Sequence, residues 1–357
     1  MAYFVASNTA RIALARKSRR SAGAAPGDGH PVTVTDVARQ AGVSPITVSR
    51  ALHRPELVSA ATRERVLEVV SRMGYRPNLL AGSLATSRSH LIAILLPTVA
   101  NSIYANVIHA IMDRLTEAGY QSLIGPTGYS AEKEQALLEA IIGRRPDGIV
   151  LTGTLHTAAC RERLANAGIP VVEAWDLSDD PLDIQVGFSH EAVGQTVGAH
   201  FLKKGCRRQG LISVDDPRAR RRNQGLARAL LDAGARPASE VILPLPSTWE
   251  VGRKGFAVML AEHPTPPDLV FCSSDTVALG VIAEASSRGL RVPEDVRVLG
   301  FGDTQNGRFA WPPLSTVSVN SEAMGEQVAR ALLRRLIGQP TETRVDTGFE
   351  LIERAST

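Results

Sequence analysis

The sequence predicts a small all-α domain followed by an α/β domain of two doubly wound parallel-sheet lobes. Three observations lead to this prediction. The chain of 357 residues is longer than one hydrophobic core usually serves. Helical patterns with capping residues fill residues 32–77. From Leu91 onward, apolar strands alternate with amphipathic helices, an order typical of parallel sheets covered by helices on both faces.

The first 31 residues do not have the form of a secretory signal. Polar and basic residues interrupt their apolar part, which is followed by a run of charge. No apolar run in the sequence is long enough to cross a membrane. We therefore expect a cytoplasmic protein. Residues 1–31 are interpreted as a disordered leader, either a basic arm that adds nonspecific affinity or the product of an upstream start codon.

Cysteine usage argues against disulfides and metal sites. Cys160, Cys206 and Cys272 are odd in number and far apart in the sequence. We expect them to be reduced, small apolar packing residues. The eight histidines are scattered as well, so we expect no metal and no cofactor.

Positive charge is concentrated at the front of the chain. Residues 1–90 contain 13 Lys and Arg against 5 Asp and Glu, whereas residues 91–357 contain 27 against 31. A basic segment beside a mildly acidic body predicts that the first segment alone binds a polyanion.

Cap signals divide residues 32–77 into three helices. Each expected helix follows a hydroxyl residue that can accept a hydrogen bond from its first free N–H groups, and two of the three end at glycine. Asp36 adds an acid to the first turn of helix one, and Pro45 suits the first position of helix two. The expected N-caps are Thr33, Ser44 and Ser59, and the expected terminal glycines are Gly42 and Gly74.

The short break after Gly42 places the second helix across the first, which is the helix-turn-helix arrangement. In the second helix, Val48, Ala51 and Leu52 face inward, while polar residues line its exposed edge. Such a helix can enter the major groove of DNA by its N-terminal end. The alternative is an ordinary helical hairpin with a solvated face.

Three stretches carry a close resemblance to the LacI family of bacterial transcription regulators: "VTVTDVARQAGVSPITVSRAL", "VSAATRERV" and "MGYRPNLLAGSLAT". The resemblance extends through residues 32–355. It implies that Pro45 and Ile46 select the operator sequence and that Arg50 contacts bases, with Ile46 touching a thymine methyl group. The remaining DNA-binding positions that we expect in the helices are Thr33, Thr35, Ser44, Thr47, Ser49, His53, Ser59 and Thr62.

Residues 78–89 are expected to form a hinge helix and linker. A helix this short, which also contains Gly82, is not stable alone in water. In the family this linker folds when two copies pack over the minor groove, and Leu84 would be the apolar wedge that kinks the DNA. Asn78 is a plausible cap, and Ala81 is expected to contact DNA too. Without the resemblance, the segment would be interpreted as an ordinary interdomain linker.

Residues 90–357 are expected to be the effector-binding and dimerisation domain. By resemblance it is of the type I periplasmic-binding-protein kind, whose two lobes are joined by crossing segments, here expected near 187–190, 313–319 and 340–343. The expected strands are "LIAILLP", "YQSLIGP", "DGIVLTG", "IPVVEAW", "RQGLISV", "EVILPLP", "DLVFCSS" and "VRVLGFG".

Ligands of doubly wound sheets bind at the carboxyl ends of the strands. The expected effector-binding residues are Ile103, Tyr104, Thr152, Asp176, Arg222, Trp249, Ser274, Asp275 and Asp303. Several have a structural alternative. Asp176 and Asp275 can cap helices or turns, Trp249 can belong to the core, and Asp303 can organise a loop.

The run "RARRRNQG" from Arg218 to Gly225 contains the main candidate for ligand binding. Arg222 matches the family position whose arginine reaches the ligand, while Arg218, Arg220 and Arg221 are expected to lie in a solvated loop. Gly302 stands where lac repressor has an aspartate that holds sugar hydroxyls. "IPVVEAWDL" and "LGFGDTQNGRFAWPPLSTV" resemble gluconate-operon repressors, and an arginine fork suits a carboxylate. The resemblance therefore implies a sugar-acid effector such as gluconate.

Two other classes of function fit the sequence less well. An enzyme would need a nucleophile, a metal cluster or a phosphate-binding loop, and the sequence has neither GxxxxGK[ST] nor HExxH. A periplasmic-type sugar-binding protein without DNA function would explain the lobes but not the basic front. We expect a homodimeric repressor that binds double-stranded operator DNA and a small effector and has no contact with membranes.

Overall fold

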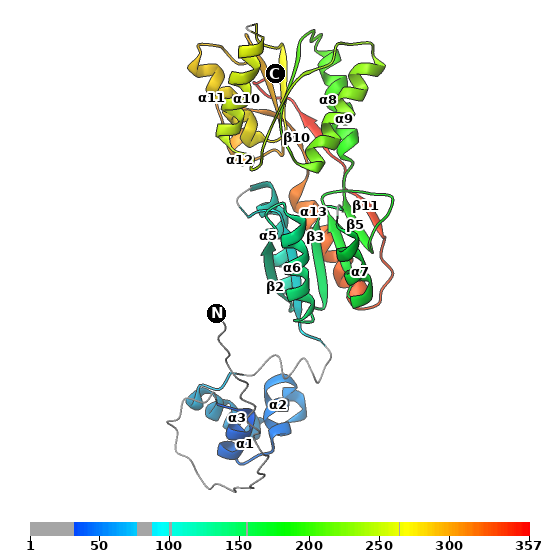
Figure 1. The fold of residues 1–357 in the computed structure, drawn as a ribbon. Helices are drawn as coiled ribbons and strands as arrows, with labels where there is room; N and C mark the ends of the chain where they lie inside the picture. The colour runs from blue at the N-terminus through cyan, green and yellow to red at the C-terminus, as the bar shows by residue number, and fades with distance from the viewer. Residues whose placement is uncertain (1–31, 77–87, 100–101, 155, 264) are drawn as a thin grey trace, which may run out of the picture. The chain divides into compact units, whose positions relative to one another are not determined.

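The structure is a computed structural model that describes residues 32–76, 88–99, 102–154, 156–263 and 265–357. The chain forms two compact units, one within residues 1–79 and the other within residues 80–357 (Figure 1). The predicted leader and most of the predicted hinge, including Asn78, Ala81 and Leu84, lie outside the described residues. The predicted domain boundary at residues 77 and 78 also lies there, and it stays a prediction.

The helical unit contains three α-helices around a small apolar core. Its elements are α1 (Val34–Ala41), α2 (Pro45–His53), the 3-10 helix η1 (Pro55–Leu57) and α3 (Ala60–Met73). The core consists of Val37, Ala38, Ala41, Val48, Ala51, Val66 and Val69. Inside α3, Val66 and Val69 are buried, whereas Val70 and Met73 are half-buried.

The predicted caps of this unit are confirmed. Thr33 and Asp36 form a capping box, with each side chain accepting from the other residue's backbone N–H. The Ser44 and Ser59 hydroxyls accept from the third N–H of α2 and α3. Gly42 ends α1 with φ of 65°, a left-handed conformation that glycine adopts at little cost.

The larger unit contains two lobes built on largely parallel sheets, as predicted. Each sheet has six strands, whereas the eight strands expected from the sequence amount to four for each lobe. We call the lobe containing the first strands the N-lobe and the other the C-lobe. All neighbouring strands in the N-lobe sheet are parallel. Its strands, in sheet order, are β11 (Arg344–Asp346), β5 (Ile184–Gly187), β4 (Val171–Ala174), β3 (Gly148–Thr152), β1 (Leu91–Leu96) and β2 (Gln121–Pro126). Its helices are α5 (Ser102–Glu117), α6 (Ala131–Ile142), α7 (Ala158–Ala167) and α13 (Ser321–Leu336).

The C-lobe sheet is parallel except for the antiparallel pair of β10 and β12. Its strands, in sheet order, are β12 (Glu350–Ile352), β10 (Ser315–Ser318), β9 (Arg297–Phe301), β8 (Leu269–Cys272), β6 (Gln209–Val214) and β7 (Ser239–Leu243). Its helices are α8 (His190–Lys203), α9 (Pro217–Asp232), α10 (Trp249–Glu262), α11 (Asp275–Ser287) and α12 (Gln305–Arg308). Both faces of each sheet are covered, which explains the long continuous buried runs, such as residues 92–96 and 269–272.

The chain crosses between the lobes three times. The crossings follow β5 at residues 188–189, β10 at 319–320 and β11 at 347–349. The first agrees with the prediction. The second lies at the very end of the predicted range, and the prediction of 340–343 for the third is wrong. The physical reason is β11, a three-residue strand that extends the N-lobe sheet beside β5 before the chain crosses.

Helices α8 and α9 pack backbone against backbone. A Cβ on Gly194 would overlap the Arg222 carbonyl oxygen, and one on Gly225 would overlap the Glu191 carbonyl oxygen. This close approach requires glycine at both positions. It fixes the backbone of α9 at Arg222, a residue of the site described next.

All three cysteines are buried and unpaired, as expected. Within the described residues, no three His, Cys, Asp or Glu side chains gather as a group that could hold a metal ion. None of the described helices is both long and apolar enough to cross a membrane.

Candidate functional site

A cavity lies between the two lobes, at the carboxyl ends of their strands. The N-lobe contributes Ile103 and Tyr104 from α5 and Trp175 after β4, and the C-lobe contributes the first turns of α9 and α11. The cavity has a volume of about 50 Å³.

Five of the nine predicted effector-binding residues line this cavity. They are Ile103, Tyr104, Arg222, Ser274 and Asp275. Ser274 is the N-cap of α11, where its hydroxyl accepts from the Val277 N–H. Asp275 is buried and accepts hydrogen bonds from Thr304 and Thr316, so its oxygens are already engaged.

The other four predicted residues lie elsewhere. The Thr152 hydroxyl donates to the Leu95 carbonyl. Asp176 bonds to Arg221 and Thr154. Asp303 organises its loop, as its alternative interpretation stated, by accepting from Arg308, Ser318 and Arg354. Trp249 begins α10 with half of its surface exposed, so it belongs neither to the cavity wall nor to the core.

The expectation that Arg218, Arg220 and Arg221 lie in a solvated loop is wrong. Residues 217–232 form α9, with Asp216 as its N-cap and Pro217 at its first position. Arg218 and Arg222 are four residues apart on one face of this helix, and only 8% and 5% of their surfaces are exposed. Both line the cavity. Arg220, by contrast, is exposed and pairs with Asp215.

Asp216 neutralises the charge of Arg218. The Arg218 Nη2 donates to Asp216 Oδ2 at 3.1 Å, and the backbone N–H groups of Arg218 and Ala219 donate to Oδ1 at 2.9 and 3.1 Å. Burial alone would raise the pKa of Asp216, but the charge and hydrogen bonds of Arg218 hold it below its ordinary value. The Arg218 guanidinium also lies over the Tyr104 ring, 5.6 Å from its centroid.

Arg222 has a different environment. Its Nη1 lies 2.9 Å from His190 Nδ1, its Nη2 donates to the Ser273 carbonyl at 3.1 Å, and its guanidinium lies 4.0 Å from the centroid of Phe301. No carboxylate oxygen of the described residues lies within ion-pair distance, 4.0 Å, of its nitrogens. Burial lowers the pKa of Arg222 to about 10.

His190 is neutral. Its Nε2 lies 3.1 Å from the Trp175 carbonyl and must carry the proton, so Nδ1 is free to accept from Arg222. Burial, together with the positive charges of Arg222, Arg218 and Arg221, holds the pKa of His190 well below its ordinary value. The cavity therefore contains a buried arginine whose charge is not compensated by a partner.

Two side-chain nitrogens at the cavity have no hydrogen-bond partner among the described residues. They are Nη1 of Arg218 and Nε of Arg222, both fully buried. Buried donors are nearly always paired, so each of these nitrogens calls for an acceptor that the described residues do not supply.

Ion pairs and hydrogen bonds also join the two lobes beside the cavity. Arg221 of α9 donates to Asp176 of the N-lobe at 2.7 Å, and the bond from His190 to the Trp175 carbonyl joins the lobes too. Burial raises the pKa of Asp176, although Arg221 opposes this effect. Tyr129 and Trp175, which both line the cavity, have positive φ angles of 60° and 79°. Such strain in residues other than glycine is concentrated at functional sites.

Several lining residues were missed by the sequence reasoning. They are Tyr129, Trp175, His190, Val214, Asp216, Arg218, Ala219, Leu245, Ser247, Ser273, Thr276, Phe301 and Thr304. A signal existed for Asp216 and Arg218, because Asp-Pro is a helix start and places Arg218 one turn before Arg222. No comparable signal marks the loop residues.

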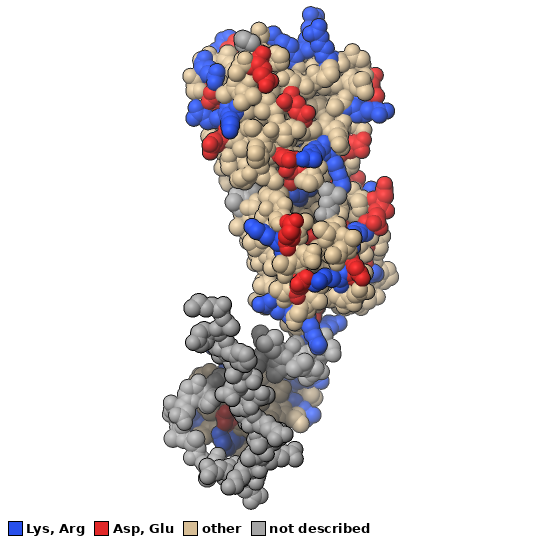
Figure 2. All heavy atoms as spheres, in the orientation of Figure 1, with Lys and Arg blue, Asp and Glu red and all other residues tan. Residues whose placement is uncertain are grey.

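The helical unit exposes the residues that we predicted to contact DNA. Pro45, Ile46, Ser49, Arg50 and His53 are exposed on α2, with 64% of the surface of Ile46 accessible. Thr47 and Thr62 are half-buried. Thr33, Thr35, Ser44 and Ser59 are exposed at the N-terminal ends of the three helices. On the α/β unit, the face shown in Figure 2 mixes basic and acidic side chains.

Comparisons with known proteins agree with both units. Residues 33–78 match the profile of bacterial regulatory proteins of the lacI family, and residues 199–357 match that of the periplasmic binding protein-like domain. The HTH-type transcriptional regulator GntR of Pseudomonas aeruginosa is 36% identical over 328 residues, which cover 91% of this chain and 95% of that protein. The chain belongs to the LacI family.

Solved structures of LacI-family proteins share the fold. A LacI-family transcriptional regulator from Silicibacter pomeroyi matches with a TM-score of 0.85 and 32% identity, covering 91% of this chain and 99% of that one. The lac repressor dimer bound to operator and the anti-inducer ONPF matches with a TM-score of 0.79 and 26% identity, covering 92% and 99%. The predicted fold class is thus confirmed. As a LacI-family member, the protein is a DNA-binding transcriptional regulator rather than an enzyme or a binding protein without DNA function.

Proposed function

We propose that the protein is a cytoplasmic repressor that binds its operator as a homodimer and is controlled by a sugar acid, such as gluconate, bound between the lobes. The observation that carries the choice of effector is Arg222. Its guanidinium is buried at the cavity, lacks a carboxylate partner and keeps Nε free. An anionic oxygen would supply both the missing charge and the missing acceptor.

The carboxylates of the cavity support an acid over a neutral sugar. Neutral sugars need acceptors for their hydroxyl protons, but Asp216 and Asp275 already accept several hydrogen bonds from protein groups. Gly302 supplies no side chain at the position where the resemblance implies an aspartate in lac repressor. The free groups at the arginine end of the cavity are donors, and donors suit a carboxylate.

We propose that residues 32–77 bind the operator and that residues 78–89 connect them to an effector domain of residues 90–357. The N-terminal end of α2 would enter the major groove, with Pro45, Ile46 and Arg50 reading bases. Thr33, Thr35, Ser44, Thr47, Ser49, His53, Ser59 and Thr62 would contact phosphates or groove walls, and Asn78, Ala81 and Leu84 would contact the minor groove.

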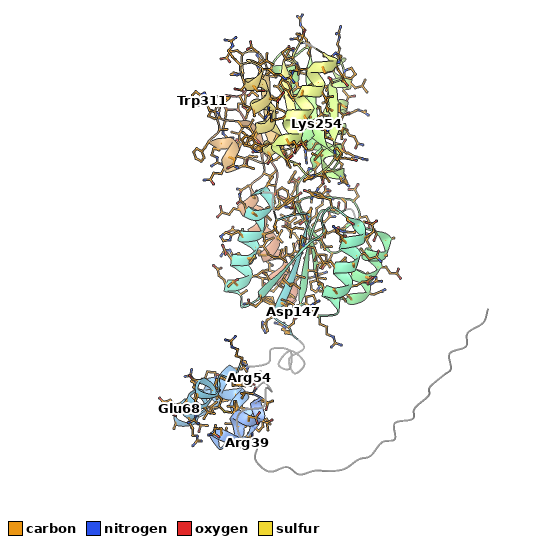
Figure 3. All side chains as sticks on the ribbon, turned by 60° about the vertical axis from the view of Figure 1, so that its left-hand side comes forward. Arg39, Arg54, Glu68, Asp147, Lys254 and Trp311 are labelled. Carbon is orange, nitrogen blue, oxygen red and sulfur yellow. The ribbon has the colours of Figure 1, made fainter. Side chains whose placement is uncertain are left out.

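We propose that an aromatic patch on the C-lobe contributes to the dimer. Trp249, Phe309 and Trp311 are 50%, 76% and 91% exposed and border one surface hollow with Leu279 and Ile282. Trp311 lies on the outer surface of this lobe (Figure 3). Large apolar side chains gathered on a surface mark a protein interface, and a regulator of a two-fold operator needs a second copy.

Effector and operator would then be coupled through the lobes. Binding of the acid changes the separation of the lobes, and this change alters the spacing of the two DNA-binding units in the dimer. Linkage requires that each ligand weakens the other by the same factor, typically about 1–3 kcal/mol.

Isothermal titration with D-gluconate and D-glucose tests the effector. The wild-type protein and Arg220→Ala, whose arginine is exposed on the same helix, should bind gluconate and not glucose. Arg222→Ala should lose gluconate binding. Glucose binding as tight as gluconate binding, or full gluconate affinity in Arg222→Ala, would contradict the proposal. Transcription from a promoter that overlaps a selected operator then tests repression, with and without gluconate.

A further inference from the structure

We infer that the cleft selects ligands with a single negative charge and that Asp216 sets this selectivity by neutralising Arg218. The inference rests on the proposed sugar-acid effector and specifies the charge that this effector carries. It concerns the arginine end of the cavity, where α9 begins.

Counting the charges at this end leaves one positive charge uncompensated. Arg218 and Arg222 are both cationic and more than nine-tenths buried. Asp216 forms an ion pair with Arg218. His190 is neutral, because its Nδ1 accepts from Arg222 and its Nε2 donates to the Trp175 carbonyl. The net charge at the first two turns of α9 is therefore the single positive charge of Arg222.

The remaining charged groups nearby are engaged elsewhere. Arg221 and Asp176 form their own ion pair across the lobes. Asp275, in the opposite wall, accepts its hydrogen bonds from Thr304 and Thr316 rather than from an arginine. Asp275 lines the same cavity, and burial raises the pKa of its carboxyl, so a second carboxylate on the ligand would meet an acid there and not a cation.

One carboxylate balances the charge at this end of the cavity. Its charge matches the uncompensated cation, and its oxygens are acceptors of the kind that Nη1 of Arg218 and Nε of Arg222 lack. A second carboxylate on the same ligand would enter a buried site in which no cation is left to pair with it. The cost of desolvating that charge would not be repaid. A monocarboxylate should therefore bind better than a dicarboxylate of equal length.

The chain provides a matched control beside Asp216. Asp215 precedes it directly and pairs with Arg220, but roughly half of each of these two side chains is exposed, 49% and 59%, and neither lines the cavity. Asp216→Asn removes the buried charge and keeps a good N-cap for α9. Asp215→Asn removes an equal charge one residue away, in solvent.

The experiment compares D-gluconate, which carries one carboxylate, with D-glucarate, which carries two, by isothermal titration. Wild type and Asp215→Asn should favour gluconate by about tenfold or more. Asp216→Asn, which leaves two uncompensated arginines, should lose this preference or reverse it. Ser247→Lys adds a cation to the cavity wall without breaking an ion pair, so it provides a second route if Asp216→Asn does not fold. It should shift the preference in the same direction.

Equal binding of the two acids by wild type would overturn the inference, as would an unchanged preference in the folded variants. Both outcomes leave the proposed effector class intact as long as gluconate binding still depends on Arg222. If neither acid binds wild type, the proposed effector itself is wrong, and the inference fails with it. The two failures are thus distinguishable.

Discussion

Arg222 donates a 2.9 Å hydrogen bond to the Nδ1 of a neutral histidine, His190, instead of pairing with a carboxylate. One turn earlier on the same helix, Arg218 pairs with Asp216. The two arginines are equally buried but electrostatically different, and the first predictions follow from this contrast.

Replacing each arginine by methionine should change stability in opposite directions. Arg222→Met removes a buried cation without a partner, so we expect the free energy of unfolding to rise by about 1 kcal/mol. Arg218→Met leaves Asp216 buried and unpaired, so we expect a loss of about 3–5 kcal/mol. Urea denaturation of both variants without ligand measures these changes. A destabilisation of Arg222→Met equal to that of Arg218→Met would show that Arg222 is compensated after all.

His190 should make the protein lose stability in mild acid. Its pKa is depressed in the folded state, so below the ordinary histidine value of about 6.5 the unfolded chain takes up a proton that the folded protein does not. Stability from this group is complete above about pH 6.5 and falls by up to about 1.4 kcal/mol for each pH unit below it. His190→Gln should reduce this slope in urea denaturation between pH 7.5 and 5. His109→Gln, exposed on α5, is the control and should leave the slope as it is in wild type.

Gly194→Ala should destabilise the protein and weaken effector binding together. The new Cβ would overlap the Arg222 carbonyl oxygen and push α8 and α9 apart. We expect the free energy of unfolding to fall by about 3 kcal/mol. Gly143→Ala is the matched control, because its φ is −61° and its nearest neighbours are 3.6 Å away. Thermal unfolding and gluconate titration of both variants check the prediction, and equal behaviour of the two would refute it.

Arg50→Ala should reduce both operator affinity and specificity. Arg50 is exposed on α2, so its removal should leave the helical unit folded and should cost about 1–3 kcal/mol of operator binding. Arg72→Ala, exposed on α3, removes the same charge and should weaken binding similarly for all duplexes. Operators selected from a random duplex pool and gel shifts at several salt concentrations measure both effects. Identical specificity profiles for the two variants would show that Arg50 does not read the bases of the operator.

Phe309→Glu should dissociate the homodimer. Phe309 is 76% exposed in the aromatic patch, and a buried charge without a partner disfavours an interface strongly. Sedimentation equilibrium should detect monomers of the variant at concentrations where wild type is dimeric. Leu231→Glu, 71% exposed at the end of α9 and outside the patch, should remain dimeric.

The regular elements could be predicted well from the sequence, because caps and apolar periods are local signals. Gly42 ends α1 in a left-handed conformation, Ser44 caps α2 with its hydroxyl, and Pro45 suits the first position of α2. Each of these signals can be read from the residue type alone. Helix α9 was missed because four arginines in five residues are typical of a solvated loop. Tertiary packing nevertheless buries two of them, Arg218 and Arg222. Strands β5, β10, β11 and β12 were missed because three or four residues are too few to establish a period, and the missing β11 misplaced the third crossing.

The site was only partly predictable for a different reason. The rule for strand ends brings residues to the correct edge of a sheet, but it does not determine where side chains point. Ile103, Tyr104 and Asp275 reach the cavity, whereas Asp176 and Asp303 turn to arginines and hydroxyls of their own surroundings. Such pairings depend on neighbours distant in sequence, and no local pattern encodes them.

The two last strands belong to different lobes: β11 completes one sheet and β12 the other. During translation, neither lobe has all its strands until residues 344–352 have left the ribosome. The three-helix unit is complete much earlier, because its last helix, α3, ends at Met73. A nascent chain therefore presents a DNA-binding surface before it can respond to any metabolite, and truncation after α13 would leave both lobes without an edge strand.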